Sequence, residues 1–180
     1  MRKIYLALLL SLFALVTTRT NAQGIFMATD PITRNGSQIE NHRDEVELTS
    51  IQYGISSEAS FIKGTGASVG KAVFSALTLT KFYDVSSVAL VDKMVTGVAI
   101  PKIEINFYDR DNRVSYRIQL EDVFVTSYET SSTGTCDHGC PDLQESISLV
   151  FRKYTIFEAN AQGGKLQQKF SFDVSQNRKL

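Results

Sequence analysis

The sequence predicts a mainly β domain, arranged as an antiparallel barrel or sandwich with a single helix. Apolar and polar residues alternate with a period of two through most segments between turns, which is typical of half-buried strands. Only one segment, near residues 84–97, shows the spacing of a helix. Strands that follow one another at short intervals, without helices between them, favour antiparallel architectures.

The strands can be placed from this alternation and from the turn residues between them. Polar stretches rich in Gly, Ser, Asn and Asp are expected to be loops. The expected strands span residues 24–28, 45–55, 73–82, 102–108, 114–128, 146–158 and 166–174, and the longest loops span residues 30–44, 56–70 and 130–142. Glu121 and Asp122 are expected to mark a bulge in the long strand 114–128.

The helix has recognisable ends. Asp84, Ser86 and Ser87 offer side chains that can cap exposed backbone N–H groups, and Gly97 is a typical C-terminal stop. Apolar residues recur between them at helical spacing, namely Val88, Leu90, Val91, Met94 and Val95. We expect this apolar stripe to pack on the core.

The first 22 residues have the composition of a secretory signal peptide. A basic start, Met1 to Lys3, precedes an apolar run from Ile4 to Val16, and small residues end at Ala22. The run is too short to span a bilayer. We therefore expect residues 1–22 to be removed and residues 23–180 to form one domain, exported to the periplasm or the extracellular space.

The charge of the mature chain argues against nucleic acid as a partner. The full chain has 19 basic and 19 acidic residues. Three basic residues and no acidic ones lie in the predicted signal peptide, which leaves a net charge of about −3, whereas nucleic-acid binding rewards basic patches. No second apolar run has membrane length, so we expect no membrane insertion.

The two cysteines, Cys136 and Cys140, lie close together in the segment TCDHGCP. In an exported protein such a pair is expected to form a disulfide. Free thiols are an alternative, and zinc is a third. Cys136, His138 and Cys140 could supply three ligands, but a structural zinc site needs four, so no metal site is assigned.

The stretch KGTGASVGKAVF, from Lys63 to Phe74, has the appearance of a phosphate-binding loop. A Walker-type loop needs Gly, four residues, Gly-Lys and then Ser or Thr at the start of a helix. Here Thr65 stands at the first Gly position, Ala72 follows Lys71, and the next segment alternates as a strand. A strand has no helix dipole to offer a phosphate, so we expect a flexible connection and no nucleotide or other cofactor.

No set of residues forms a recognisable catalytic site. The histidines, His42 and His138, both lie in polar loops and are expected to be solvated. Asp109 and Asp111 are expected in a hairpin turn, and Glu121 and Asp122 are adjacent on a strand, which directs them to opposite faces. The sequence therefore predicts a non-enzymatic protein.

Four segments stand out together, at residues 77–97, 116–132, 145–159 and 170–180. In their order they resemble the haemolysin-coregulated protein (Hcp) family, whose members form the tube of type VI secretion systems. LTLTKFYDVSSVALVDKMVTG, residues 77–97, is similar to the strand–helix signature of the family. YRIQLEDVFVTSYETSS, residues 116–132, and ESISLVFRKYTIFEA, residues 145–159, resemble later strands, and FSFDVSQNRKL resembles the family's C-terminal tail. The matching residues are Thr80, Lys81, Asp84, Ser87, Leu90, Gly97, Leu120, Asp122 and Val123.

The resemblance implies a β-barrel of two antiparallel sheets with one flanking helix. It also implies hexameric rings that stack into a tube, with sheath or spike components and effector proteins as partners. In the family an extended loop reaches the neighbouring ring, and Ser56 to Lys71 falls at that place. The expected stacking residues are Ser57, Lys63, Gly64, Gly66, Gly70 and Lys71, because small residues permit close backbone contact.

Two functions remain open on the sequence alone. The first is a ring-forming structural subunit like the secretion tube protein. The second is an exported binding module on the same fold, monomeric or weakly oligomeric, that recognises a protein or a glycan. The strand–helix order favours the first, and the signal peptide favours the second.

Overall fold

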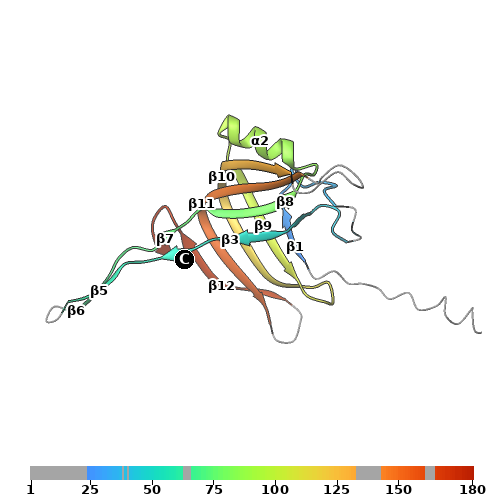
Figure 1. Cartoon of the computed structure of the whole chain (residues 1–180). Coiled ribbons are helices and arrows are strands. Elements are labelled where there is room, and N and C mark those ends of the chain that lie inside the picture. Colours follow the sequence, from blue (N-terminus) through green and yellow to red (C-terminus); the bar gives the residue numbers. More distant parts are fainter. Residues whose placement is uncertain (1–23, 38, 40, 63–65, 133–142, 161–164) are drawn as a thin grey trace, which may run out of the picture.

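The strands of this protein form a continuous nine-stranded antiparallel sheet that curls into a barrel, with one helix at its end (Figure 1). The computed structural model describes residues 24–180 except 38, 40, 63–65, 133–142 and 161–164. The elements are β1 (Ile25–Ala28), β2 (Val46–Leu48), β3 (Ser50–Gln52), β4 (Ile55–Ser56), β5 (Ala59–Ile62), β6 (Gly66–Val69), β7 (Val73–Phe74), β8 (Leu77–Phe82), α2 (Ser87–Thr96), β9 (Ile100–Tyr108), β10 (Val114–Ser132), β11 (Leu143–Ala159), β12 (Leu166–Asp173) and β13 (Arg178–Lys179).

Residues 46–52 close the barrel. β2 pairs with β1, and after a bend at Thr49 the chain continues as β3, which pairs with β8. The other strands follow in the order β8, β11, β10, β9 and β1, so the sheet returns to its starting point. The single strand expected over residues 45–55 is therefore divided at Thr49, because its two halves pair with different neighbours.

The barrel has two sheets because β10 and β11 each belong to both. The first part of β10 pairs with β9, and the last part of β11 pairs with β12. The first part of β11 instead pairs with β8. The sheet β9–β10–β11–β12 thus passes into the sheet β10–β11–β8–β3 through two long strands, which confirms the expected mainly β barrel of two antiparallel sheets.

The core lies between these two sheets. Alternate residues of β8, β9, β10 and β11 are buried, as period-two strands require. Leu90 of α2 joins the same cluster. The largest fully buried side chains are Tyr154, Phe26, Lys81, Met27, Leu77, Leu79, Leu90, Ile100, Ile103, Ile105, Ile118 and Leu120.

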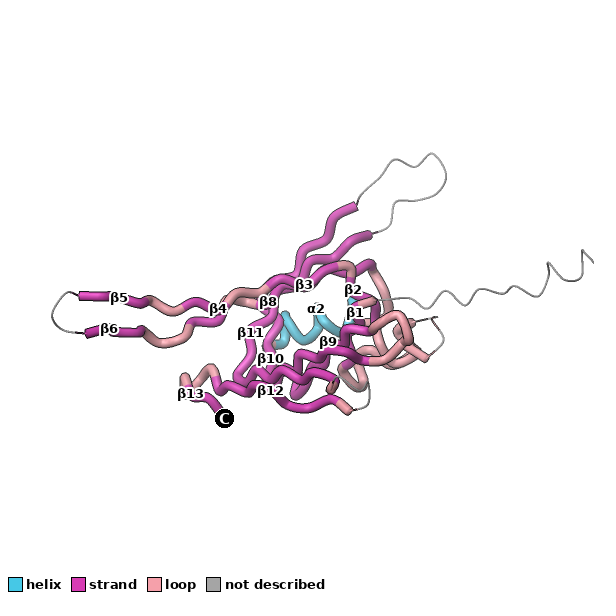
Figure 2. Tube along the Cα trace, turned by 90° about the horizontal axis from the view of Figure 1, so that it is seen from below, coloured by secondary structure: helices cyan, strands magenta, loops and turns pink. Residues whose placement is uncertain are grey.

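The helix follows the prediction closely, and the segment after β3 does not. α2 ends where expected, at Gly97, whose φ of 65° lies in the left-handed region that favours glycine. The expected loop over residues 56–70 instead contains the antiparallel ladder β5–β6, and at its base β4 pairs with β7. Together they form a narrow ribbon that leaves the barrel (Figure 2), and we call residues 54–75 the arm.

Candidate functional site

The arm is anchored at its root by hydrogen bonds and by one aromatic ring. Ser75 N–H donates to Gly54 O at 2.9 Å, and Gly54 N–H donates to Ser75 Oγ at 2.7 Å. The Phe74 ring lies 5.2 Å from the Phe172 ring and 5.6 Å from the Tyr154 ring, between ring centroids. Because Tyr154 is fully buried, the root of the arm is fixed to the barrel core.

The described part of the glycine-rich stretch, from Gly66 to Phe74, belongs to the arm, and its backbone groups pair within the ribbon. Gly70 N–H, which a phosphate would need, donates to Glu58 O at 2.6 Å across the ribbon. A Cβ at Gly70 would lie 3.2 Å from that same oxygen, so this position favours glycine by close approach. The residues after it form β7 and β8, as expected, and Lys71 is exposed.

The expected stacking residues are spread along the arm. Ser57 is exposed between β4 and β5, and Gly66 is the first residue of β6. Lys63 and Gly64 lie outside the described residues. The ribbon form was not expected from the sequence, because its strands are only two to four residues long and lack clear alternation. The stacking role of these residues stays a prediction.

A buried ion cluster joins α2 to the barrel. Lys81 Nζ lies 2.7 Å from Glu145 Oε2 and 2.9 Å from Asp84 Oδ1, and it donates to Ser87 Oγ at 2.9 Å. Ser87 Oγ in turn donates to Glu145 Oε2 at 2.8 Å and accepts from Asp84 N–H at 3.0 Å. Lys81 and Glu145 are completely buried, so each charge depends on the other for compensation.

The cluster also explains how the helix begins. Asp84 Oδ1 accepts from Ser86 N–H at 2.7 Å and from Ser86 Oγ. Tyr128 donates its hydroxyl to Glu145 Oε1, and burial, with this carboxylate as the second cause, raises the pKa of Tyr128. Ser86 is the N-cap residue, but its side chain caps no N–H group of the first turn, contrary to expectation. The side chains of Asp84 and Ser87 instead accept from backbone N–H groups just before the helix.

Thr80 holds the segment that closes the barrel. Its backbone oxygen accepts from Thr49 N–H at 2.8 Å. Its hydroxyl lies 2.8 Å from Thr49 Oγ1 and 2.6 Å from Ser50 Oγ. Two adjacent residues of β8 therefore stabilise different parts of the fold. Thr80 holds the bend between β2 and β3, and Lys81 holds the helix.

Asp122 marks the place where β10 passes from one sheet to the other. Its φ of 51° is unusual for a residue other than glycine, although Asp and Asn tolerate it better than most. Leu120 and Val123 are both buried although they are three residues apart. The bend at Asp122 therefore shifts the inward-facing positions by one residue. The pairing register does not change there, and the shift in register lies between Val125 and Ser127, beyond the expected bulge.

Arg152 secures this bend from the neighbouring strand. Its Nε donates to Asp122 Oδ2 at 2.6 Å, and its Nη1 lies 3.3 Å from Asp173 Oδ2. One guanidinium group thus links β10, β11 and β12 where the two sheets meet. No pattern in the sequence pointed to Arg152, because its partners are 21 and 30 residues away.

Asp173 should make stability depend on pH in the acid range. Hydrogen bonds from Ser175 Oγ and Gln176 N–H, together with Arg152, hold its pKa below the ordinary value. A lowered carboxyl pKa stabilises the fold above the unfolded value, near pH 3.9, and the gain is lost as pH falls through the folded pKa. We expect Asp173→Asn to lower the free energy of unfolding at pH 7, and the difference from wild type to shrink below about pH 4 in urea titrations. A difference that stays constant from pH 7 to pH 3 would contradict this.

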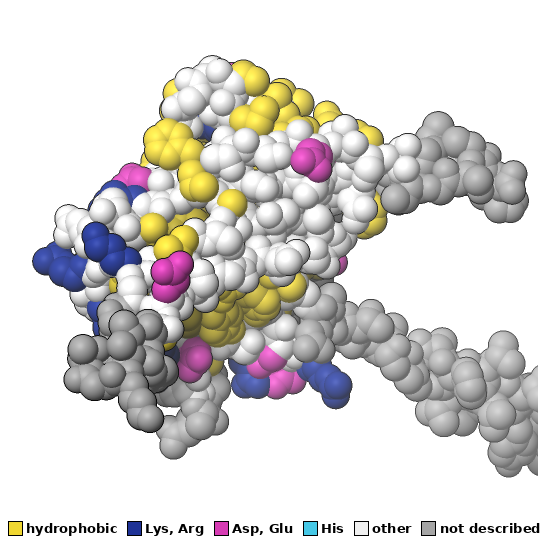
Figure 3. Space-filling model, turned by 60° about the vertical axis from the view of Figure 1, so that its left-hand side comes forward, with side chains coloured by type: hydrophobic (Ala, Val, Ile, Leu, Met, Phe, Trp, Pro, Cys, Tyr) yellow, Lys and Arg dark blue, Asp and Glu magenta, His cyan; other side chains and the backbone are white. Residues whose placement is uncertain are grey.

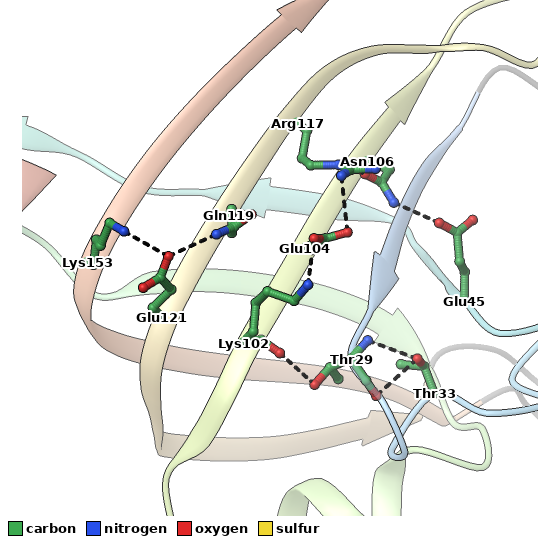
Figure 4. Close-up of polar contacts among 10 residues, drawn as sticks. All are labelled: Thr29, Thr33, Glu45, Lys102, Glu104, Asn106, Arg117, Gln119, Glu121 and Lys153. Carbon is green, nitrogen blue, oxygen red and sulfur yellow. Dashed lines mark hydrogen bonds and ion pairs between the residues drawn. The ribbon is translucent and has the colours of Figure 1, made fainter. Parts of the chain in front are cut away.

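The outer face of β9, β10 and β11 carries a polar network that satisfies itself (Figure 4). Arg117 lies 3.3 Å from Glu104 and donates to Asn106 Oδ1 at 2.7 Å. Glu121 accepts from Lys153 at 3.0 Å and from Gln119 at 2.9 Å. These groups bond to one another and so stabilise the wall of the barrel.

His42 is buried, which corrects the expectation that it is solvated. Its ring stacks on Phe26 at 4.1 Å, and only 2% of the residue is exposed. Its Nδ1 lies 2.7 Å from Glu45 Oε2, and its Nε2 lies 2.7 Å from Asn112 Oδ1. Glu45 also accepts from Tyr108 and from Asn106, which makes His42 part of a structural network. A polar loop alone could not reveal a partner 70 residues away.

Of the remaining groups considered in the sequence, Asp109 and Asp111 lie in the described part of the chain. Asp109 accepts from Asp111 N–H at 2.8 Å and from Arg113 N–H at 3.0 Å, so it stabilises the expected turn. Cys136, His138 and Cys140 lie outside the described residues, and their disulfide stays a prediction. In the part of the chain that the structure describes, no three His, Cys, Asp or Glu residues gather as metal ligands. No described helix is long and apolar enough to span a membrane.

The comparisons with known proteins decide the family. Residues 26–157, well over half of the chain, match the model of the family described as "Type VI secretion system effector, Hcp". This chain belongs to the Hcp family. A search of curated protein sequences gave no match.

Solved structures agree with the Hcp fold. A protein described as a type six secretion system protein has a TM-score of 0.75 and 25% identity, and the match covers 88% of this chain and all of that one. Hcp1 from Salmonella typhimurium has a TM-score of 0.70 and 21% identity, covering 88% and 99%. A type VI secretion system effector from Yersinia pestis has a TM-score of 0.64 and 19% identity, covering 83% and 99%.

The helix of this Hcp-family chain presents apolar side chains to solvent, contrary to expectation. Leu90 is buried and Met94 packs partly against the core. Val88 and Val95, which were expected to pack on the core, are 67% and 71% exposed. The helical period was identified correctly, but it could not distinguish the face toward the barrel from an apolar face left open.

Proposed function

We propose that this protein is a non-enzymatic structural subunit that assembles into hexameric rings, which stack into a tube that carries effector proteins. Membership of the Hcp family supports a structural component of a type VI secretion system. The arm is the observation that most supports this proposal. It projects from the barrel, and beyond its root its described residues pack against no other strand of the barrel, so it is available to contact another subunit. Sheath or spike components would be further partners.

The ring itself needs a lateral contact, and β12 offers one. β13 pairs only with Phe172 and Asp173 at the end of β12. In the described part of the chain no strand covers the outer edge from Leu166 to Phe170. Gln167, Gln168 and Lys169 make this edge polar, as natural edges are, so its pairing would be confined to a fitting neighbour.

Residues 1–22 remain part of the proposal. We propose that they direct export and that the mature chain begins at Gln23. Export would place ring formation outside the cytoplasm. If the chain worked alone there, it would be the exported binding module that the same fold permits.

The mass of the assembled protein tests the proposal. Light scattering on the chain from Gln23, at several concentrations, is expected to give a mass near six subunits. A variant with Asn-Gly in place of residues 57–72 should keep the hexamer and lose larger assemblies. Ser56 and Val73 are paired across the ribbon, so a two-residue turn can join them.

The outcomes separate the two functions. A stable monomer at every concentration, with the full arm present, would overturn the ring and favour the binding module. Larger assemblies that persist without residues 57–72 would show that the arm is not needed for stacking.

A further inference from the structure

A cleft lies at the start of α2, where the helix meets the segment that closes the barrel and the loop that follows β1. Its volume is about 310 Å³. We call it the helix-start cleft, and the residues that line it include Ile39, Glu47, Thr49, Phe82, Tyr83 and Asp84. None of the side chains that line it is basic. A concave surface with apolar walls and a few polar groups is the usual form of a binding site.

The apolar walls of the cleft are open to solvent. Ile39 is 37% exposed, and the aromatic side chains of Phe82 and Tyr83 are 47% and 56% exposed. Val85 and Val88 extend this apolar surface onto the helix, and Figure 3 shows hydrophobic side chains along the upper part of the molecule, where Figure 1 places α2. Exposed apolar surface of this kind marks a place where another protein binds, and aromatic residues are enriched there.

The buried ion cluster next to the cleft carries more negative than positive charge. Asp84 and Glu145 share a single ammonium group, that of Lys81. Among the residues that the structure describes, no other Lys or Arg forms an ion pair with either carboxylate. The side chain of Glu145 is completely buried, whereas that of Asp84 is 19% exposed and lines the cleft. The surplus negative charge therefore reaches the cleft through Asp84.

Glu47 adds a second acidic group to the same cleft. It is the exposed residue of β2, between Val46 and Leu48, which both face the core. Within the described part of the chain, no hydrogen bond or ion pair engages its carboxylate. Two carboxylates thus stand beside exposed aromatic rings, and no basic side chain of the cleft balances them. A cation from another molecule would complete the charge balance.

We propose that the helix-start cleft binds an arginine side chain that is carried on an apolar segment of a partner protein. The guanidinium group supplies the positive charge that the cleft lacks, and its planar face can stack on the ring of Phe82 or Tyr83. Apolar residues beside the arginine would cover the exposed walls. The cleft is complete within one chain, so this inference does not depend on whether rings form.

Matched peptides test the role of charge. Leu-Arg-Leu amide and the same peptide with citrulline, which has nearly the shape of arginine but no charge, each carry a fluorescein label. Fluorescence anisotropy is measured as the full mature chain is added. We expect the arginine peptide to bind at least about tenfold more tightly, because its hydrogen bonds to carboxylates are charge-assisted. Equal affinities, or no saturable binding of the arginine peptide, would overturn the inference.

A single substitution tests the place of binding. Glu47→Gln changes an exposed side chain, so the circular dichroism of the barrel should not change. It should weaken the arginine peptide by about two- to fivefold, as expected for one partly exposed ion pair, and leave the citrulline peptide unaffected. The matched control is Glu158→Gln, an exposed glutamate at the other end of β11, which should bind both peptides as wild type does. Equal effects of the two variants would overturn the inference.

A third comparison tests whether the partner is a protein segment. Unlabelled Leu-Arg-Leu amide should displace the labelled arginine peptide at a concentration at least about tenfold lower than acetyl-arginine amide does, because only the tripeptide covers the apolar walls. If both compete equally, the cleft recognises a small cation alone, and a protein segment as the occupant is excluded.

Discussion

Replacing Lys81 by methionine is expected to lower the free energy of unfolding by about 3–5 kcal/mol. Methionine fills similar space, but it leaves Glu145 charged and fully buried with hydroxyl donors alone. Removing one partner of a buried ion pair costs more than replacing both, because the remaining charge is neither hydrated nor compensated. Urea denaturation followed by circular dichroism measures the change.

Two further variants isolate the cause. Lys102→Met removes a lysine that is mostly exposed and lies 3.0 Å from Glu104, and such surface pairs contribute only about 0–1 kcal/mol. The double variant Lys81→Met, Glu145→Leu should be more stable than Lys81→Met alone, because the fully buried charge of Glu145 is gone and only the partly exposed Asp84 remains. If Lys81→Met were as mild as Lys102→Met, the cluster would not hold the helix as we describe.

When Asp122 is replaced, we expect the loss of stability to depend on the backbone conformation at this position more than on the loss of charge. Asp122→Val should cost about 2–3 kcal/mol, because a β-branched residue strains at a φ of 51° and the bond to Arg152 is lost. Asp122→Asn keeps a residue that tolerates this conformation and should cost less than about 1 kcal/mol. Asp122→Gly loses the hydrogen bond to Arg152, but glycine adopts the positive φ without strain.

Thermal or urea unfolding of the three variants gives the order directly. The expected stability order is Asn and Gly above Val. If Gly were as damaging as Val, the ion pair with Arg152 would be the main contribution, and the positive φ would matter little. Asp44, an exposed aspartate outside the strands, offers a matched control as Asp44→Asn.

Patterns within single segments predicted the fold class and the main elements. They could not predict which distant segments pair with one another. Alternation located the main strands, and Gly97 marked the end of α2, because both depend on neighbours in the chain. The division at Thr49 and the buried state of His42 depend on residues more than 30 positions away. Residue types alone do not contain that information.

In the candidate site, too, the contacts between distant residues could not be predicted from the sequence. The resemblance brought attention to Lys81, Asp84, Ser87 and Asp122, but Glu145 and Arg152, which hold them, were not singled out. Both are ordinary strand residues in the sequence, and only the pairing of β11 with β8 and β10 brings them to their partners. The open face of α2 could not be foreseen, because apolar spacing is the same whichever side meets water.

The way residues 46–52 close the barrel has a consequence for folding. β1 must find β9, with Ile25 opposite Phe107, and β8 must find β11, with Leu77 opposite Leu149. Pairings across so many residues form slowly, because a long loop loses its freedom before any contact compensates for it. β1 is made before the other strands and stays without its β9 partner until Phe107, 82 residues after Ile25, has followed. The barrel cannot close until Leu149 of β11 has also been made. It therefore stays open for most of the synthesis, a condition that transport across a membrane in an extended form would require.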